Sequence, residues 1–253
     1  MSRQSGGLGP LARLLRPFLG GKGGNPWPPF WVLRQEVPLA GAEQELEAAT
    51  AEIMGEVQRR KPASGTFHVT TLRLDGGDHL FLMPLRGPAG LADLMSEWNR
   101  LAMEVGASRW GEMAARGNRA METFSLRVFM EPPGLGWRPE GAPGLGDRSG
   151  AFLFDFFHLR PVAEQQFGPV VRELATVCRD RVPGGFTVLL CTAGAELPLV
   201  VLVWTAPDAA ELQRREEALA AAGGAAILER LEGLARRRER RRGELRPQLS
   251  HLP

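Results

Sequence analysis

Hydrophobic residues recur at helical spacing in two separate stretches of the chain. In each stretch, four apolar residues are separated by steps of three or four positions. The two sets are Leu46, Ala49, Ile53 and Val57, and Phe167, Val170, Leu174 and Val177. Such spacing puts one apolar stripe along an α-helix. The sequence therefore predicts an amphipathic helix in each stretch.

Aromatic and β-branched residues gather before and after these helices. "FWVLRQEV" (30–37) and "AFLFDFFHLR" (151–160) precede them and are typical of strands. Two further strands follow each helix, and Gly- and Asp-containing turns join them, which favours hairpins. The predicted antiparallel pairs are 66–74 with 78–85, and 186–193 with 197–205.

A second helical region follows each hairpin. It opens after Pro88 in the first stretch and after Pro207 in the second, and proline suits a first helical turn. The first of these regions carries an apolar stripe that includes Trp98. We predict that the second runs through 208–240, and that "TFSLRVFM" (123–130) and "GELRPQLS" (243–250) are the closing strands.

The same order, β-α-β-β-α-β, therefore occurs twice, and this is the ferredoxin-like unit. Three pairs of markers are each 119 residues apart and indicate an ungapped duplication. They are Phe67 with Phe186, Pro88 with Pro207, and Leu126-Arg127 with Leu245-Arg246. The predicted organisation is a disordered leader and linker (1–29), a first repeat (30–131), a Pro/Gly-rich linker (132–150) and a second repeat (151–253).

A ferredoxin-like sheet has helices on one face only, so its other face needs a cover. Many residues of the open faces are apolar, and the second repeat can cover the first. The predicted fold class is therefore α+β, with two tandem ferredoxin-like repeats whose sheets pack together as an intramolecular α/β-barrel.

This arrangement resembles the dimeric α/β-barrel superfamily in its tandem form. The run "REEALAAAGGAAILERLEGLARRRERRRGELRPQLSHLP" (215–253) is similar to NIPSNAP-like proteins in its charged helix, small-residue break, second helix and closing "LRP" strand. It departs from them at Gly223-Gly224, where that family usually has an aromatic and an acidic residue. The superfamily includes cofactor-free monooxygenases, haem-binding and haem-degrading enzymes, and proteins with no known reaction.

Charge and cysteine content narrow the range of partners. Lys and Arg total 31 against 29 Asp and Glu, so no global basic field attracts nucleic acid. Cys178 and Cys191 lie in apolar stretches, as buried free thiols do, with a disulfide as the alternative. No apolar run reaches the roughly 20 residues that span a bilayer. We expect a cytoplasmic protein, although the acid-free basic leader leaves organelle targeting or membrane-surface contact open.

The run "RRRERRR" (236–242) is the densest charge in the chain. Arginines at a helix end favour the helix dipole and stay solvated, so we interpret the run as the end of a helix. Binding of a phosphate-rich partner is the alternative.

The histidines offer little metal chemistry. His68, His79, His158 and His251 form no helical pair at metal-ligand spacing, and no HExxH or CxxC occurs. In haem-binding relatives, the axial histidine comes from the helices of the second half, where this chain has none. The resemblance therefore gives no support for haem, and we predict no cofactor.

His68 is the first catalytic candidate. In "FHVTT", strand alternation places His68 and Thr70 on one face, directed to the space between the two sheets. His68 could act as a general base toward a small molecule, since histidine titrates near neutrality. The alternative is a histidine held at the sheet surface by threonine or backbone.

Asp155 is the second catalytic candidate, because an acid among Phe and Leu is costly to bury without a partner. Arg34 or Arg73 could neutralise it. His158 lies three residues further along the strand and so faces the opposite side. Candidate ligand contacts are Thr70, Arg34, His158 and Trp98; Trp98 is alternatively a core residue of its helix stripe.

Two functions remain open from the sequence. One is a small-molecule-binding or enzyme-like α/β-barrel, most specifically with a cofactor-independent monooxygenase-like activity. The other is a non-catalytic structural or interaction protein of NIPSNAP-like type, in which side chains fill the barrel. The expected partners are a small-molecule ligand and, through the barrel edges, further copies of this chain. A ligand-sized cavity that contains His68 or Asp155 would favour the first function.

Overall fold

The computed structural model of the chain describes residues 29–60, 62, 67–87, 89–142, 144–145, 149–194 and 197–252. The predicted leader apart from residue 29, Pro88 at the predicted helix start, and parts of the predicted linker therefore lie outside the described residues. Within the described part of the chain, no helix has the length and apolarity needed to cross a membrane. The expected cytoplasmic location stays a prediction.

The first repeat has the predicted order of elements, with two helices before its last strand. These are β1 (Phe30–Pro38), α2 (Glu43–Arg60), β2 (Thr70–Leu74), β3 (His79–Leu85), α3 (Gly90–Val105), α4 (Ala107–Ala120) and β4 (Met121–Met130). Gly106 separates α3 from α4 because its positive φ of 98° is a conformation that residues with a side chain rarely adopt.

The second repeat has the same order. Its elements are β5 (Ala151–Leu159), α5 (Glu164–Arg181), β6 (Phe186–Ala193), β7 (Leu199–Ala206), α6 (Ala209–Ala221), α7 (Gly224–Leu234) and β8 (Ala235–Leu245), followed by a 3-10 turn, Pro247–Leu249. Asp208 caps α6 by accepting a hydrogen bond from the Glu211 backbone N–H at 2.7 Å. Gly223, with a φ of 85°, separates α6 from α7.

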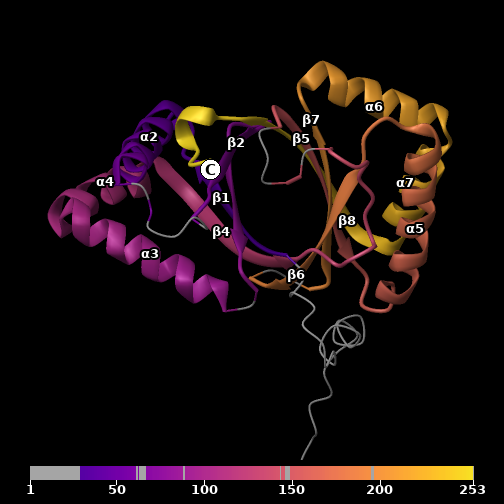
Figure 1. Cartoon of the computed structure of the whole chain (residues 1–253), viewed down its shortest axis with the longest axis horizontal. Coiled ribbons are helices and arrows are strands. Elements are labelled where there is room, and N and C mark those ends of the chain that lie inside the picture. Colours follow the sequence, from indigo (N-terminus) through magenta and orange to yellow (C-terminus); the bar gives the residue numbers. More distant parts are fainter. Residues whose placement is uncertain are drawn as a thin grey trace, which may run out of the picture.

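The eight strands form one closed antiparallel barrel in the order β1-β3-β2-β8-β5-β7-β6-β4. Figure 1 shows the barrel between two groups of helices, with α2, α3 and α4 on one side and α5, α6 and α7 on the other. The repeats meet where β2 pairs with β8 and where β4 pairs with β6, through three residue pairs at each junction. The predicted fold class is confirmed.

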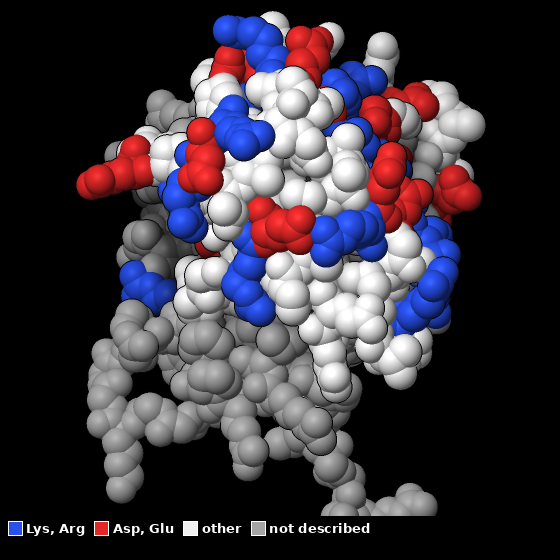
Figure 2. Space-filling view, turned by 90° about the vertical axis from the view of Figure 1, so that its right-hand side faces the viewer, with Lys and Arg blue, Asp and Glu red and all other residues white. Residues whose placement is uncertain are grey.

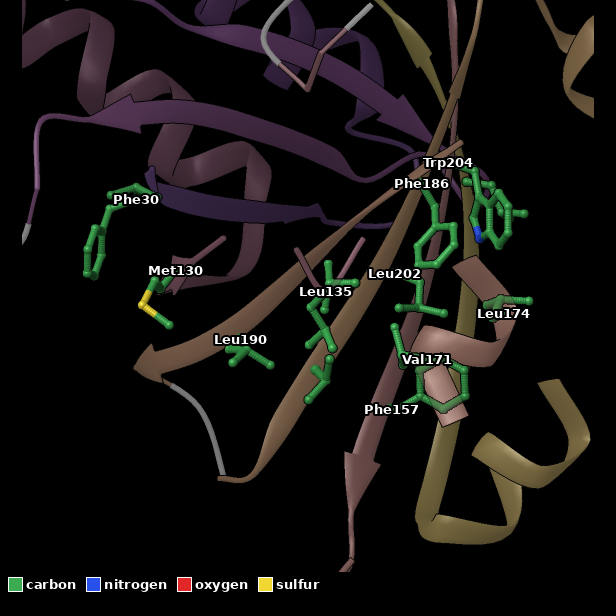
Figure 3. Close-up of a cluster of buried hydrophobic side chains, with 14 of the residues drawn as sticks. Phe30, Met130, Leu135, Phe157, Val171, Leu174, Phe186, Leu190, Leu202 and Trp204 are labelled. Carbon is green, nitrogen blue, oxygen red and sulfur yellow. The ribbon is translucent and has the colours of Figure 1, made fainter. Parts of the chain in front are cut away.

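Alternation along the strands separates two apolar cores. One fills the barrel with side chains such as Trp31, Leu72, Phe129, Phe154 and Val201. The other lies between the sheets and the helices. Figure 3 shows part of this outer core, where Phe157 of β5 lies beside Val171 of α5. The barrel interior is thus packed by side chains.

Both predicted hairpins are confirmed. β2 pairs with β3 and β6 pairs with β7, in each case antiparallel. The first strand of the first hairpin is shorter than expected, because β2 begins at Thr70. His68 therefore precedes the strand.

The interpretation of the arginine run was wrong. Residues 236–242 do not end a helix: α7 ends at Leu234, and the run forms most of β8. The closing strand is therefore Ala235–Leu245 and not 243–250. Pairing with the apolar strand β5 along its whole length explains how so basic a segment becomes a strand. Arg238 on its outer face and Arg241 on its inner face form close ion pairs with Asp155 and with Asp75 and Asp78.

The uniform offset between the repeats was also wrong. Phe129 of β4 and Gly243 of β8 occupy equivalent places at the two junctions, since they pair with Cys191 and Leu74 respectively. That equivalence aligns Arg127 with Arg241, not with Arg246. The duplication holds at the level of element order and strand pairing, while its connections differ in length.

Candidate ligand cavity

A cavity of about 330 Å³ lies in the first repeat, between the outer face of the sheet and the helices α2, α3 and α4. Its walls are mostly apolar. They include Val32, Met54, Phe81, Met83, Leu94, Trp98, Trp110 and Leu126. A volume of this size falls within the range of small-molecule sites, which are typically apolar with a few placed polar groups.

The polar floor of the cavity comes from β1. Arg34 and Glu36 are two residues apart, so both side chains lie on the helix-facing side of the strand. Their Nη2 and Oε1 atoms are 2.6 Å apart. The Arg34 guanidinium also lies 5.1 Å from the centre of the Phe124 ring of β4, a cation–π contact.

Glu36 is the buried member of this pair. Its side chain is 10% exposed, whereas that of Arg34 is 37% exposed. Burial raises the pKa of the Glu36 carboxyl above its ordinary value, and the charge and hydrogen bond of Arg34 offset part of this effect. A carboxyl with a raised pKa can exchange a proton closer to neutral pH than an exposed one.

Two tryptophans form an aromatic wall. Trp98 of α3 and Trp110 of α4 have ring centres 5.8 Å apart, and Phe67 packs edge-on against Trp98 at 5.1 Å. The amides Asn99 and Asn118 also line the cavity. Flat aromatic walls with polar groups at one side suit a planar organic molecule.

His68 and Thr70 lie elsewhere. Neither lines the cavity, and the His68 Nε2 is 3.1 Å from the Thr70 hydroxyl. Thr70 is fully buried. The contact between them is the one expected of a histidine held by a threonine, and a catalytic role for His68 stays a prediction.

Asp155 lies on the helix-facing side of β5, outside this cavity. Its Oδ1 accepts hydrogen bonds from Arg238 Nε at 3.0 Å and Nη2 at 2.8 Å, and it lies 3.8 Å from Arg240. The expected partners Arg34 and Arg73 were therefore wrong. The partners belong to the arginine run, and a catalytic role for Asp155 stays a prediction.

His158 faces the opposite side from Asp155, as predicted. It pairs across β5 and β8 with Arg237, whose Nη2 lies 2.8 Å from its Nε2. Of the predicted ligand contacts, the cavity therefore brings together Arg34 and Trp98, and it does not include Thr70 or His158. Trp98 also packs against the outer core, and its role as a ligand contact stays a prediction.

Sequence reasoning missed Glu36 and gave the two asparagines no role. A signal for Glu36 was present. Arg34 and Glu36 follow Val32 at steps of two residues in "FWVLRQEV", so all three lie on the same face of the strand. That face lies under an amphipathic helix, so a charged pair on it is a candidate site.

The second repeat does not fit a haem. Its helices α5, α6 and α7 contain no histidine, and the space between its sheet and helices is about 150 Å³. Within the part of the chain that the structure describes, no group of three or more His, Cys, Asp or Glu could hold a metal ion.

The fold is similar to those of solved structures. A "putative monooxygenase" of Lactobacillus acidophilus NCFM has a TM-score of 0.55 at 9% identity, over 89% of this chain and 99% of that chain. An "anthrone oxidase-like protein" has a TM-score of 0.51 at 13% identity, over 86% and 91%. A haem-binding protein of Thermus thermophilus has a TM-score of 0.50 at 15% identity, over 88% and 96%.

At these identities the similarity shows the fold alone. No protein-family model matches the chain, and no curated protein matches it either. The resemblance to NIPSNAP-like proteins gains no support from these comparisons. Function must therefore be argued from the cavity.

Proposed function

We propose that this protein binds a small, planar organic molecule in the cavity of the first repeat. The observation that carries this proposal is a ligand-sized apolar cavity with a buried acid, Glu36, paired with Arg34 on one wall. The Nε of Arg34 is buried and has no hydrogen-bond partner. An oxygen of the ligand would supply that partner.

In its most specific form, the activity is a cofactor-independent oxidation by O₂. Glu36 removes a proton from an acidic C–H of the substrate, and Arg34 stabilises the anion that forms. The anion reduces O₂. One oxygen atom ends as a new C=O group, and the other leaves with the two hydrogens of the original CH₂ as water.

A tricyclic ketone such as anthrone is the substrate class that we propose to test first. Its C–H group is acidic because the resulting anion is delocalised over the rings, and its flat shape suits the wall of Trp98 and Trp110. The names of two structural neighbours, a "putative monooxygenase" and an "anthrone oxidase-like protein", agree with this choice.

The test is oxygen consumption by the full chain with anthrone, with anthraquinone measured by its absorbance. Wild type should turn over, and Glu36→Gln should lower kcat by about 100-fold or more, the usual contribution of a general base. Glu52→Gln is the matched control, because Glu52 lies on the same side of the molecule in α2 and pairs with Arg116 at the surface. Equal rates for wild type and Glu36→Gln would contradict the proposed role.

A non-catalytic function of NIPSNAP-like type is the second candidate. The packed barrel interior favours it, because side chains fill the space that a ligand between the sheets would need. This candidate predicts that aromatic ligands such as anthrone and 2-naphthol cause no saturable quenching of tryptophan fluorescence. Saturable quenching that is lost on changing Trp98 to Leu would reject it.

Assembly with further copies of this chain also stays a proposal. On the side away from β1, β4 is paired only at its last three residues, 128–130, and on the side away from β5, β8 is paired only at 243–245. Residues 121–125 of β4 and 235–241 of β8 have no strand partner on that side among the residues that the structure describes, and such edges can pair with another chain. Light scattering at several protein concentrations tests this, and a monomer at every concentration would contradict it.

A further inference from the structure

The two closing strands place one arginine each at equivalent points inside the barrel. Phe129 pairs with Cys191, and Gly243 pairs with Leu74, at the two junctions between the repeats. Arg127 and Arg241 precede Phe129 and Gly243 by two residues, so they share the inward face of their strands. The surroundings of these two arginines can therefore be compared directly.

Arg241 is neutralised. Its Nε donates to Asp75 at 2.9 Å, and its Nη2 donates to Asp78 at 2.9 Å. Gln35 of β1 donates to the same Asp78 carboxylate at 2.7 Å. The β2–β3 turn thus supplies two carboxylates to one guanidinium.

Arg127 lacks this acidic environment. In the second repeat, strand pairing places Thr192 and Leu199 where the first repeat has Asp75 and Asp78. Arg127 lies 6.0 Å from the centre of the Phe156 ring and forms no ion pair with any residue that the structure describes. A guanidinium with no carboxylate beside it can bind an anion through charge-assisted hydrogen bonds.

Two further groups border the same place. His158 follows Phe156 by two residues, so it shares the inward face of β5, and it is only 6% exposed. Arg237 of β8 donates to its Nε2 at 2.8 Å, which requires a neutral imidazole. The Arg237 guanidinium is 3.8 Å from its nearest carboxylate, Glu239, which is a long ion pair.

The charges around His158 agree with a positive local field. Burial is the main cause that lowers the pKa of His158, and the cations Arg237, Arg127 and Arg236 lower it further. Glu239 acts in the opposite direction and raises it. The three arginines thus act together on this buried ring.

We propose that Arg127, Arg237 and His158 form an anion-binding site at the end of the barrel where β5 ends. The site takes a small molecule with an oxyanion, either a carboxylate or a phosphate. Two guanidinium groups match the oxygen geometry of such a group. The site lies on the opposite face of the sheets from the cavity of Glu36, so it does not depend on the proposed oxidation.

The probe is the His158 ring of the full chain labelled at histidine, observed by NMR and assigned with His158→Gln. Sodium phosphate and sodium acetate are titrated separately at constant pH and at an ionic strength held with sodium chloride. We expect a saturable shift with at least one of these anions. Arg127→Gln should weaken its binding by about tenfold or more, since a charge-assisted hydrogen bond is lost.

Arg241→Gln is the matched control, because this arginine is already neutralised by Asp75 and Asp78, and it should leave the affinity unchanged. Arg237→Gln provides a second variant if Arg127→Gln does not fold. Phosphate and acetate reveal which oxyanion the site prefers. The proposal is wrong if neither anion gives a saturable shift, or if chloride gives the same shift. It is also wrong if the folded Arg127 or Arg237 variant binds as tightly as wild type.

Discussion

The two repeats share one fold but fill the space under their helices differently. The first repeat has a cavity of about 330 Å³ there, and the second has one of about 150 Å³. β1 and β5 both contain nine residues, and each begins opposite the last residue of its hairpin strand. Arg34 is therefore equivalent to Asp155, and Glu36 to Phe157.

The difference between Glu36 and Phe157 explains why the cavity of the first repeat is larger. Glu36 borders the cavity of the first repeat, whereas Phe157 is fully buried and packs edge-on against Phe167 of α5 with ring centres 5.9 Å apart. Figure 3 shows Phe157 beside Val171 and below Leu174. At this position the second repeat thus has a packed aromatic residue where the first repeat has an acid beside a cavity.

The other difference, Asp155 in place of Arg34, explains how β8 is held against the helices of the second repeat. Asp155 binds Arg238, and Arg238 and Arg240 also reach Glu232 of α7 and Glu216 of α6. These ion pairs tie β8 to its helices. Figure 2 shows acidic and basic side chains intermingled on this side of the molecule. In the first repeat, Arg34 meets Phe124, which is 56% exposed, and no such network closes the edge among the residues that the structure describes.

Phe157→Ala should have the largest effect on stability. The change leaves a hole in a fully buried part of the second repeat, and we expect a loss of about 4 kcal/mol in the free energy of unfolding. Glu36→Ala, at the equivalent position, should cost less than about 1 kcal/mol, since that space is already open. Urea unfolding measures both, and equal losses would remove the distinction between the repeats.

Asp155→Ala should come next, with a loss of about 3 kcal/mol. Asp155 is fully buried, and its removal leaves Arg238, which is 17% exposed, without its main counterion. Urea unfolding is again the measurement, and Glu52→Ala at the surface is the control. A loss below about 1 kcal/mol would show that the ion pairs of β8 contribute little to the stability of the second repeat.

Glu36 should give the first repeat a distinctive pH dependence. Its pKa is raised in the folded state, so the native protein holds a proton that the unfolded chain releases. This stability is present below the ordinary carboxyl pKa and is lost as the pH rises toward the folded value, by at most about 1.4 kcal/mol per unit. The difference in unfolding free energy between wild type and Glu36→Gln, measured across the acidic to neutral range, should show this slope. A flat difference would contradict it.

The smallest change in stability should come from making the first repeat resemble the second. Glu36→Phe with Leu46→Phe places aromatic residues where the second repeat has Phe157 and Phe167. The double variant should stay within about 1 kcal/mol of wild type, because the new rings fill existing space. Quenching of the tryptophan fluorescence of this variant by 2-naphthol should nevertheless be lost. Retained binding would place the ligand outside this cavity.

Much of the fold follows from local pattern. Alternation, helical spacing and Gly/Asp turns were enough to predict both hairpins and the tandem barrel. The strand β8 was missed because an unbroken run of charged residues is typical of solvated segments, and no local pattern shows that Asp155, Asp75 and Asp78 are available to pair with it. Long-range ion pairs decide the structure of that segment.

The site was predicted only in part, for a related reason. Arg34 and Trp98 were among the candidates, but Asp155 drew attention as the buried acid, although its partner Arg238 lies 83 residues further along the chain. Glu36 was overlooked because it is a candidate site residue only through the cavity between β1 and the helices α2 and α4. An empty space between elements has no signature in either element alone.

The most direct test of the account is to locate a bound ligand. A crystal of the full chain soaked with 6-bromo-2-naphthol gives the bromine position by anomalous scattering. We predict one main peak between Trp98, Trp110 and Arg34, in the first repeat. A main peak beside Trp204 in the second repeat, or a first-repeat cavity left empty while 2-naphthol binds in solution, would contradict the central claim that only the first repeat holds the site.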